Sequence, residues 1–214
     1  MPSKLRPLLG RVPQILLIVV ALVLMVQTER FFTPGTLASI LTQASIVGVL
    51  AIGQTFVLLG GGFDLSQGAM LALTAAAVAH LNQWEAGTAA CLAAAAGVGL
   101  LLGAINGFFV SVVRANPFVT TLSTLLIFRG AAFIALEGRP FSNIRVFQFL
   151  DSGFQIGATH LPYRGLIFLA VTFAAWVVLR MTVFGQHVYA LGGNADAARL
   201  AGVRTTRLRI ATFA

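Results

Sequence analysis

The stretch from Phe184 to Arg209, FGQHVYALGGNADAARLAGVRTTRLR, is the longest clearly polar and basic segment of the chain. It follows the apolar run from Gly165 to Leu179, and long apolar runs dominate everything before it. Lys and Arg accumulate in the loops of membrane proteins that face the cytoplasm. We therefore expect this segment to be the surface that a cytoplasmic protein contacts.

Within this segment, residues 194–202 predict a short exposed helix. Gly192 and Gly193 are expected to break what precedes it, because glycine tolerates backbone angles that other residues avoid. Asn194 is a good N-cap, and Asp196 falls in the first turn, where a negative charge suits the helix dipole. Gly202 is predicted to end the helix.

The predicted helix has small, helix-favouring residues on its surface, which would let another protein approach closely. A solvated loop between two spans is the alternative interpretation of the same residues. The small or apolar positions are Ala197, Ala198, Leu200 and Ala201, and the flanking arginines are Arg199, Arg204, Arg207 and Arg209.

Composition indicates a helical membrane protein. Of the 214 residues, 58% are apolar and only 9% are charged, whereas a soluble domain has about 25% charged residues. The apolar runs do not alternate with polar positions, as the strands of a membrane β-barrel do. We predict an all-α, polytopic transmembrane bundle that forms one domain over residues 1–214. In a membrane protein the location of Lys and Arg matters more than their sum. The net charge of +8 therefore indicates no nucleic-acid partner.

The apolar runs predict about six complete spans, since a spanning helix needs about 20 residues. The first run follows Lys4, Arg6 and Arg11 as in a signal peptide, but no small-residue cleavage site follows it, so we interpret it as an uncleaved span. The predicted spans are 15–26, entered at about Pro13, then 37–59, 67–81, 88–113, 117–136 and 165–181.

The chain stops at Ala214, a few residues into a new apolar segment that starts at about Leu208. We interpret this segment as the start of a seventh span, and the chain as the N-terminal portion of a longer protein.

The distribution of basic residues predicts a cytoplasmic N-terminus. In that orientation the inner segments hold nine Lys and Arg residues and the outer ones hold four, which obeys the positive-inside rule. The inner residues are Lys4, Arg6, Arg11, Arg114, Arg180, Arg199, Arg204, Arg207 and Arg209, and the outer ones are Arg30, Arg139, Arg145 and Arg164.

The densest polar motif is the stretch from Gly60 to Gly68, GGGFDLSQG, between the second and third spans. Gly60, Gly61 and Gly62 are expected to break the second span. Asp64 or Ser66 can cap the third span, and Ser66 is the better placed of the two. An acid at the edge of a bilayer is costly unless paired, so Asp64 is a candidate for a hinge anchor or for a gating or pathway residue.

Two further polar residues lie within apolar spans. Arg129 is deep in the fifth span, where it can extend to the interface or pair with an acid or a carbonyl of a neighbouring helix. Gln54 precedes the glycine break and can bond to another helix or face a pathway.

The sequence gives no sign of catalysis. There is no nucleophile–base pair, and the glycines at 60–62 lack the lysine and Ser/Thr of a nucleotide-binding loop. The histidines are far apart, and the lone Cys91 suggests neither a metal site nor a disulfide. The chain is therefore predicted not to be an enzyme and to carry no cofactor or metal.

Three ordered blocks resemble the membrane-spanning permeases of bacterial ABC importers for simple sugars of the ribose, xylose and galactose type. The similarity runs from about Leu37 to the end. The Asp-Leu-Ser pattern favours a sugar, because the related branched-chain amino acid permeases lack it. The blocks are IGQTFVLLGGGFDLSQGAMLAL at 52–73, NPFVTTLSTLLIFRGAAFIALEGRP at 116–140 and VFGQHVYALGGNADAARLAGV at 183–203.

This resemblance implies a location in the bacterial inner membrane and several partners. These are an ATPase that binds ATP and Mg²⁺, a periplasmic or lipid-anchored sugar-binding protein, a second permease copy of the same or another kind, and membrane lipid. The segment at about 184–209 would couple to the ATPase. Asp196, Ala197, Ala198 and Gly202 fit the family's pattern of an acid, two alanines and a later glycine.

Two other functions remain open on the sequence alone. A transporter driven by an ion gradient would need ionisable residues within its spans, and Asp64 and Arg129 are the charged candidates. A non-transporting remnant or scaffold is the other alternative, because the chain is shorter than members of the family it resembles.

Overall fold

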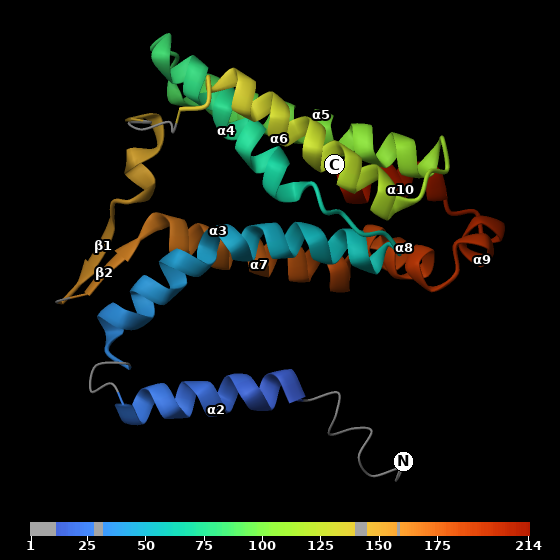
Figure 1. Ribbon diagram of the computed structural model, residues 1–214. Coiled ribbons are helices and arrows are strands. Elements are labelled where there is room, and N and C mark those ends of the chain that lie inside the picture. Colours follow the sequence, from blue (N-terminus) through green and yellow to red (C-terminus); the bar gives the residue numbers. More distant parts are fainter. Residues whose placement is uncertain (1–11, 28–31, 140–144, 158) are drawn as a thin grey trace.

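A computed structural model describes residues 12–27, 32–139, 145–157 and 159–214. These residues are mainly helical, which confirms the prediction of a helical membrane bundle (Figure 1). The elements are α2 (Val12–Gln27), α3 (Pro34–Leu59), α4 (Gln67–Gln83), α5 (Thr88–Ser111), α6 (Pro117–Ala135), η1 (Arg145–Leu150), β1 (Gly153–Ile156), β2 (Thr159–Pro162), α7 (Tyr163–Met181), α8 (Val183–Gly193), α9 (Ala195–Leu200) and α10 (Thr205–Phe213).

Four of the described helices, α3, α5, α6 and α7, are long and apolar enough to cross a membrane. Helix α2 is apolar but has 16 residues, and α4 has 17, so both fall short of the roughly 20 residues that a full crossing needs. The count of six complete spans is therefore not confirmed. The predicted seventh span corresponds to α10, which begins at Thr205 rather than Leu208.

Helix α3 begins earlier than predicted. The predicted span starts at Leu37, whereas Pro34 is the first helical residue. Proline suits this position, because its missing N–H has no partner in the first turn of a helix. Thr33 caps the helix: its hydroxyl oxygen accepts a bond from the backbone N–H of Thr36 at 3.3 Å.

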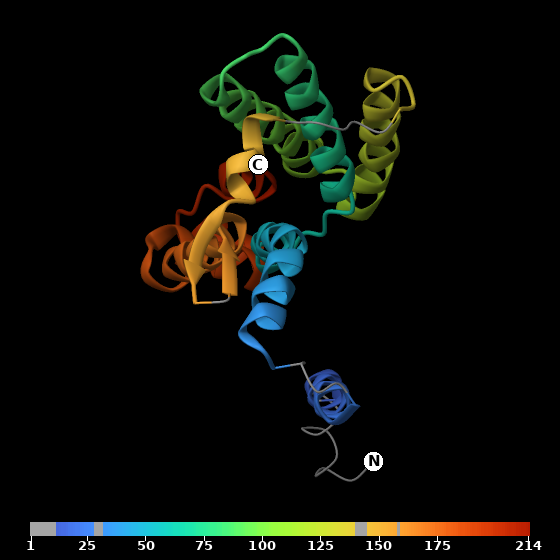
Figure 2. The ribbon, with the colours of Figure 1, turned by 90° about the vertical axis from the view of Figure 1, so that its left-hand side faces the viewer.

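The helices form two packed groups joined by the chain between α3 and α4 (Figures 1 and 2). In one, α4 packs against α5 and α6; in the other, α3 packs against α7. Helix α10 packs against both α5 and α3, and so ties the groups together. Helix α2 lies apart from both groups in the two views, and none of its residues is buried.

Helix α10 approaches α5 closely enough to require glycine. A Cβ on Gly103 would lie 2.2 Å from the carbonyl oxygen of Phe213, and one on Gly107 would lie 2.7 Å from the Cα of Ile210. Helices in a membrane gain little from the hydrophobic effect, so close backbone contact of this kind is a main source of their packing energy. The glycine-rich character of the predicted fourth span therefore serves this contact.

The connection between α6 and α7 contains a short β-hairpin, which the all-α prediction did not include. Strands β1 and β2 pair antiparallel, with Gly153 opposite Pro162 and Ile156 opposite Thr159. The Arg164 guanidinium lies 3.2 Å from the Asp151 carboxylate and fastens the base of the hairpin to the first turn of α7.

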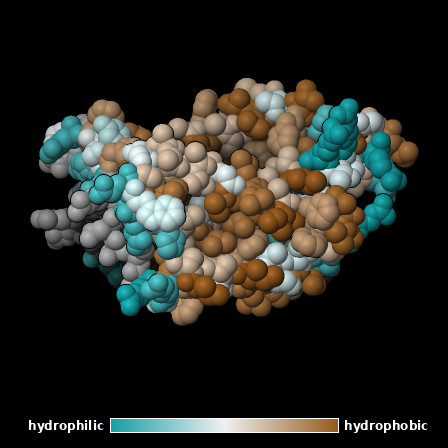
Figure 3. Space-filling model, turned by 90° about the horizontal axis from the view of Figure 1, so that it is seen from above, coloured by the Kyte–Doolittle hydropathy of each residue, from teal (hydrophilic) through white to brown (hydrophobic). Residues whose placement is uncertain are grey.

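The surface shows a belt of apolar side chains. In Figure 3 hydrophobic residues cover the middle of the visible face, and hydrophilic ones gather toward its two ends. Large apolar residues such as Leu101, Leu126 and Phe173 are more than half exposed. Side chains of this kind are stable in contact with lipid rather than water.

Candidate functional site

The helices at one end of the bundle form a compact knob, opposite the β-hairpin (Figure 1). Helices α8, α9 and α10 meet around a core of Val188, Leu191 and Leu208. Leu59, the last residue of α3, packs against this core. The knob is thus continuous with the end of a membrane-spanning helix.

Helix α9 has the cap that the sequence predicts. The Asn194 side-chain oxygen accepts bonds from the N–H groups of Asp196 at 3.1 Å and Ala197 at 2.9 Å. Gly202 follows the helix with φ of +88°, a conformation that glycine adopts without strain. The preceding helix α8 ends at Gly193 as expected, although both glycines are its last helical residues and not part of a loop.

The two sides of α9 differ. Ala198 is buried at 5% exposure, so it packs inward and is not part of the outer surface. Ala197, Leu200 and Ala201 are exposed, and their i, i+3, i+4 spacing places them on one face. Leu200 is 87% exposed, which is unusual for a leucine beside a well-packed core. The predicted small face therefore exists without Ala198, and Leu200 is its largest side chain.

Arg199 lies on the other side of α9. Its guanidinium is 3.5 Å from the Asp196 carboxylate, and both side chains are mostly exposed. Ion pairs at exposed sites contribute little to stability. This pair orients the two side chains rather than holding the helix together.

Helix α8 touches the end of α3 through its backbone. A Cβ on Gly192 would lie 1.9 Å from the carbonyl oxygen of Leu59, whereas one on Gly193 would have nothing within 4 Å. A Cβ on Gly61, which has φ of +76°, would lie 3.5 Å from the Cα of Gly192. The knob therefore rests directly on the glycine break between α3 and α4.

Beyond the glycines, a buried polar cluster holds the break in place. The Asp64 Oδ1 atom accepts two bonds of 2.7 Å, from the backbone N–H and from the hydroxyl of Ser66. The Asn106 Nδ2 donates to Ser66 Oγ at 2.8 Å and approaches Asp64 Oδ2 at 3.5 Å. The Thr121 hydroxyl contacts the carbonyl of Phe63 at 3.4 Å. Loop 60–66, α5 and α6 are thereby joined.

This cluster corrects the expected role of Ser66. Ser66 occupies the N-cap position of α4, but its side chain makes no capping bond. Its hydroxyl donates to Asp64 instead, so Asp64 organises the turn as an anchor. Asn106 is fully buried and completes the cluster; the sequence marks it only as a polar residue in an apolar helix.

The other candidate residues do not join the cluster. Gln54 is half-buried on α3, before the glycine break. Arg129 is exposed on α6, next to Phe128, which packs into the core between α4 and α5. Arg129 forms no ion pair within the described part of the chain.

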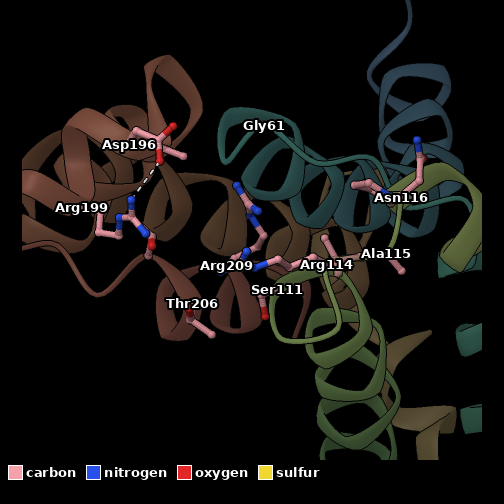
Figure 4. Close-up of a pocket in the computed structure, with 13 residues that line it drawn as sticks. Gly61, Ser111, Arg114, Ala115, Asn116, Asp196, Arg199, Thr206 and Arg209 are labelled. Atoms are coloured by element: carbon pink, nitrogen blue, oxygen red, sulfur yellow. Dashed lines mark ion pairs between the residues drawn. The ribbon is translucent and has the colours of Figure 1, made fainter.

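A basic pocket of about 770 Å³ lies beside α9 (Figure 4). It is enclosed by the turn between α5 and α6, by α9 and by the start of α10. Arg114, Arg199 and Arg209 line it together with one acid, Asp196. The sequence did not indicate this pocket, because its arginines come from three separate elements.

Residues 36–214 match the family described as "Branched-chain amino acid transport system / permease component". The chain is 34% identical over 205 residues to the ribose import permease protein RbsC of Escherichia coli strain K12, covering 93% of this chain and 63% of the relative. It is 33% identical over 214 residues to RbsC of Bacillus subtilis, covering 99% and 64%. The fructose import permease protein FrcC of Rhizobium meliloti is 32% identical over 191 residues, covering 86% and 53%.

The chain thus spans less than two thirds of the length of these relatives. No solved structure matches it significantly.

The polar cluster predicts different outcomes for two changes at Asp64. Asp64→Leu leaves the backbone N–H and the hydroxyl of Ser66 buried without their acceptor, and we expect it to destabilise the protein by about 2–4 kcal/mol. Asp64→Asn keeps an oxygen for both Ser66 donors and loses only the longer contact of 3.5 Å between Oδ2 and Asn106 Nδ2. It should therefore cost less than about 1 kcal/mol. Thermal unfolding in detergent measures both; equal losses would contradict the anchoring role.

Proposed function

The chain belongs to the branched-chain amino acid transport system / permease component family, and on that basis we propose that it is the permease subunit of an ABC importer for a monosaccharide. Its similarity to import permeases for ribose and fructose supports a sugar as the substrate. The observation that carries the proposal is the exposed leucine face of α9, braced against the end of a spanning helix.

The proposed orientation puts the knob in the cytoplasm of a bacterium and the hairpin outside the inner membrane. Charge supports this orientation. The knob and the adjoining turns carry Arg114, Arg180, Arg199, Arg204, Arg207 and Arg209, while the segments assigned to the outer side carry the smaller set of Arg30, Arg139, Arg145 and Arg164. In this proposed arrangement α2 and α4 complete the set of six spans.

We propose that Ala197, Leu200 and Ala201 dock on an ATPase that binds ATP and Mg²⁺. A face of two alanines and one exposed leucine suits insertion into a shallow apolar cleft, since the leucine fills the cleft and the alanines allow close approach. Asp196, Arg199 and Gly202 shape the edge and the end of the helix, Asn194 caps it, and Ala198 fixes it to the knob.

Movement of the docked helix would reach the membrane through Gly192. Because Gly192 lies against the Leu59 carbonyl and Gly61, a displacement of α8 must displace the glycine break. The cluster around Asp64 then carries this displacement to α5 and α6. Such a rigid-body shift can open the bundle alternately to the two sides of the membrane. A sugar-binding protein outside and a second permease copy complete the proposed complex.

The orientation can be tested by labelling. In a Cys91→Ala background, a membrane-impermeant maleimide should label Phe154→Cys on the hairpin in intact cells. It should label Leu200→Cys only after permeabilisation, since both side chains are exposed but at opposite ends. Labelling of Leu200→Cys in intact cells would rule out the proposed topology.

The docking face predicts that Leu200→Ser lowers co-purification of the co-expressed ATPase at least tenfold. Loss of a buried leucine at an interface costs about 2 kcal/mol or more. Val183→Ser, also an exposed apolar residue at the same end, is the control and should retain the ATPase. Uptake of radiolabelled ribose, fructose and allose is measured in parallel, and undiminished uptake by Leu200→Ser would refute the docking proposal.

If movement is transmitted through Gly192, a change at this residue should impair sugar uptake without impairing ATPase binding. Gly192→Ala introduces a methyl group against the Leu59 carbonyl, so we expect uptake to fall more than tenfold while the ATPase still co-purifies. Gly193→Ala adds the same group where there is open space and should transport normally. Equal uptake by both variants would mean that the contact does not transmit movement.

A further inference from the structure

The basic pocket beside α9 contains positive charge that the chain does not neutralise. Figure 4 shows the side chains of Arg114 and Arg209 directed into the space between the α5–α6 turn and α9. Neither forms an ion pair within the described ranges, whereas Arg199 pairs with Asp196. Two guanidinium groups that share one pocket repel each other unless an anion lies between them.

The acids of this chain are committed elsewhere. Asp64 is buried and bonded to Ser66, and Asp151 pairs with Arg164 at the hairpin. Glu85 follows the end of α4 and Glu137 follows the end of α6, and these two helix ends lie opposite the knob (Figure 1). Glu29 is outside the described residues. The anion that fits the pocket therefore comes from another molecule.

The start of α10 adds donors to the two arginines. Thr205 and Thr206 line the pocket in the first turn of this nine-residue helix. The N–H of Thr205 donates to the Val203 carbonyl at 2.9 Å, but no side chain caps this helix at Arg204, so the positive end of its dipole can attract an anion. Hydroxyls, N–H groups and guanidinium forks together suit a phosphate group.

The surroundings of the pocket favour a phosphate that belongs to a lipid. The turn that carries Arg114 is flanked by apolar residues on both sides: Val112 and Val113 at the end of α5, and Phe118 and Val119 at the start of α6. These four side chains are 49%, 55%, 54% and 59% exposed. A phospholipid can lay its acyl chains against them while its headgroup enters the pocket.

We propose that this pocket binds the phosphate group of an anionic phospholipid from the leaflet on the knob side of the membrane. Arg114 and Arg209 bind the phosphate, with donors from the first turn of α10. Because Asp196 and Arg199 line the same pocket, the headgroup also contacts the side of α9 that carries Arg199. This last consequence rests on the proposed function; the lipid site itself does not.

The test compares lipid retention by charge-matched variants. The purified full chain is placed in detergent with equal amounts of phosphatidylglycerol and phosphatidylcholine, and bound lipid is counted by native mass spectrometry. Arg114→Asn and Arg209→Gln are combined in the site variant. Asn is chosen because Arg114 has φ of +61°, a conformation that asparagine tolerates. Arg204→Gln with Arg207→Gln is the control, since both arginines lie outside the pocket lining.

We expect the wild-type chain and the control pair to prefer phosphatidylglycerol. The site variant should lose this preference by about fivefold for each guanidinium removed. Each single variant is measured too, so that misfolding of the pair does not prevent a result. Equal losses in the site and control pairs would overturn the proposal, because they would indicate a general charge effect.

Two further outcomes would also overturn it. If free inorganic phosphate at millimolar concentration displaces phosphatidylglycerol completely, the pocket is a site for soluble anions. If the site variant keeps its lipid but loses the co-purified ATPase, the anion is an acidic segment of that protein. Failure of the docking proposal is separate: Leu200→Ser can leave ATPase binding unchanged while lipid retention still follows Arg114 and Arg209.

Discussion

Non-helical backbone can lie within a membrane only where the protein itself bonds its N–H and C=O groups. The break between α3 and α4 meets this constraint. Gly61 and Gly62 donate back to the carbonyls of Leu58 and Val57 at 3.0 and 2.9 Å, and Ser66 donates to Asp64. The Asp64 carboxylate thus accepts hydrogen bonds that water would otherwise accept. The position of α4 against α5 and α6 depends on these hydrogen bonds.

Small residues set the other close contacts. Gly103 and Gly107 admit the backbone of α10 against α5, and Gly192 admits the carbonyl of Leu59. In each place a methyl group would collide with backbone, which cannot rotate aside as a side chain can. Contacts of this kind move as units, so the knob, the glycine break and α10 behave as one connected body. Under the proposed function, a displacement of α9 would therefore displace the ends of the spanning helices as well.

The sequence predicts the features that depend on local chemistry. The Asn194 cap, the stop at Gly202 and the long apolar helices follow from residue type and spacing alone. It did not predict features that depend on distant partners. The Ser66 hydroxyl bonds to Asp64 and Asn106 and therefore does not cap α4. Ala198 is buried because the rest of the knob covers it. The hairpin was missed because its strands are only four residues each, too short for a clear alternation.

The arginines at the knob end of the bundle can act in two ways. Their number favours one orientation of the spans in the membrane, and this effect does not depend on where each side chain points. The structure adds position: Arg204 and Arg207 lie outside the basic pocket, whereas Arg114 in the α5–α6 turn and Arg209 on α10 both line it. The left-handed backbone of Arg114, with φ of +61°, belongs to the turn that ends α5, because Glu85 and Glu137 have φ of 56° and 52° in the turns after α4 and α6. What distinguishes Arg114 from those two residues is a second guanidinium in the same pocket, so its position, and not its charge alone, has a consequence.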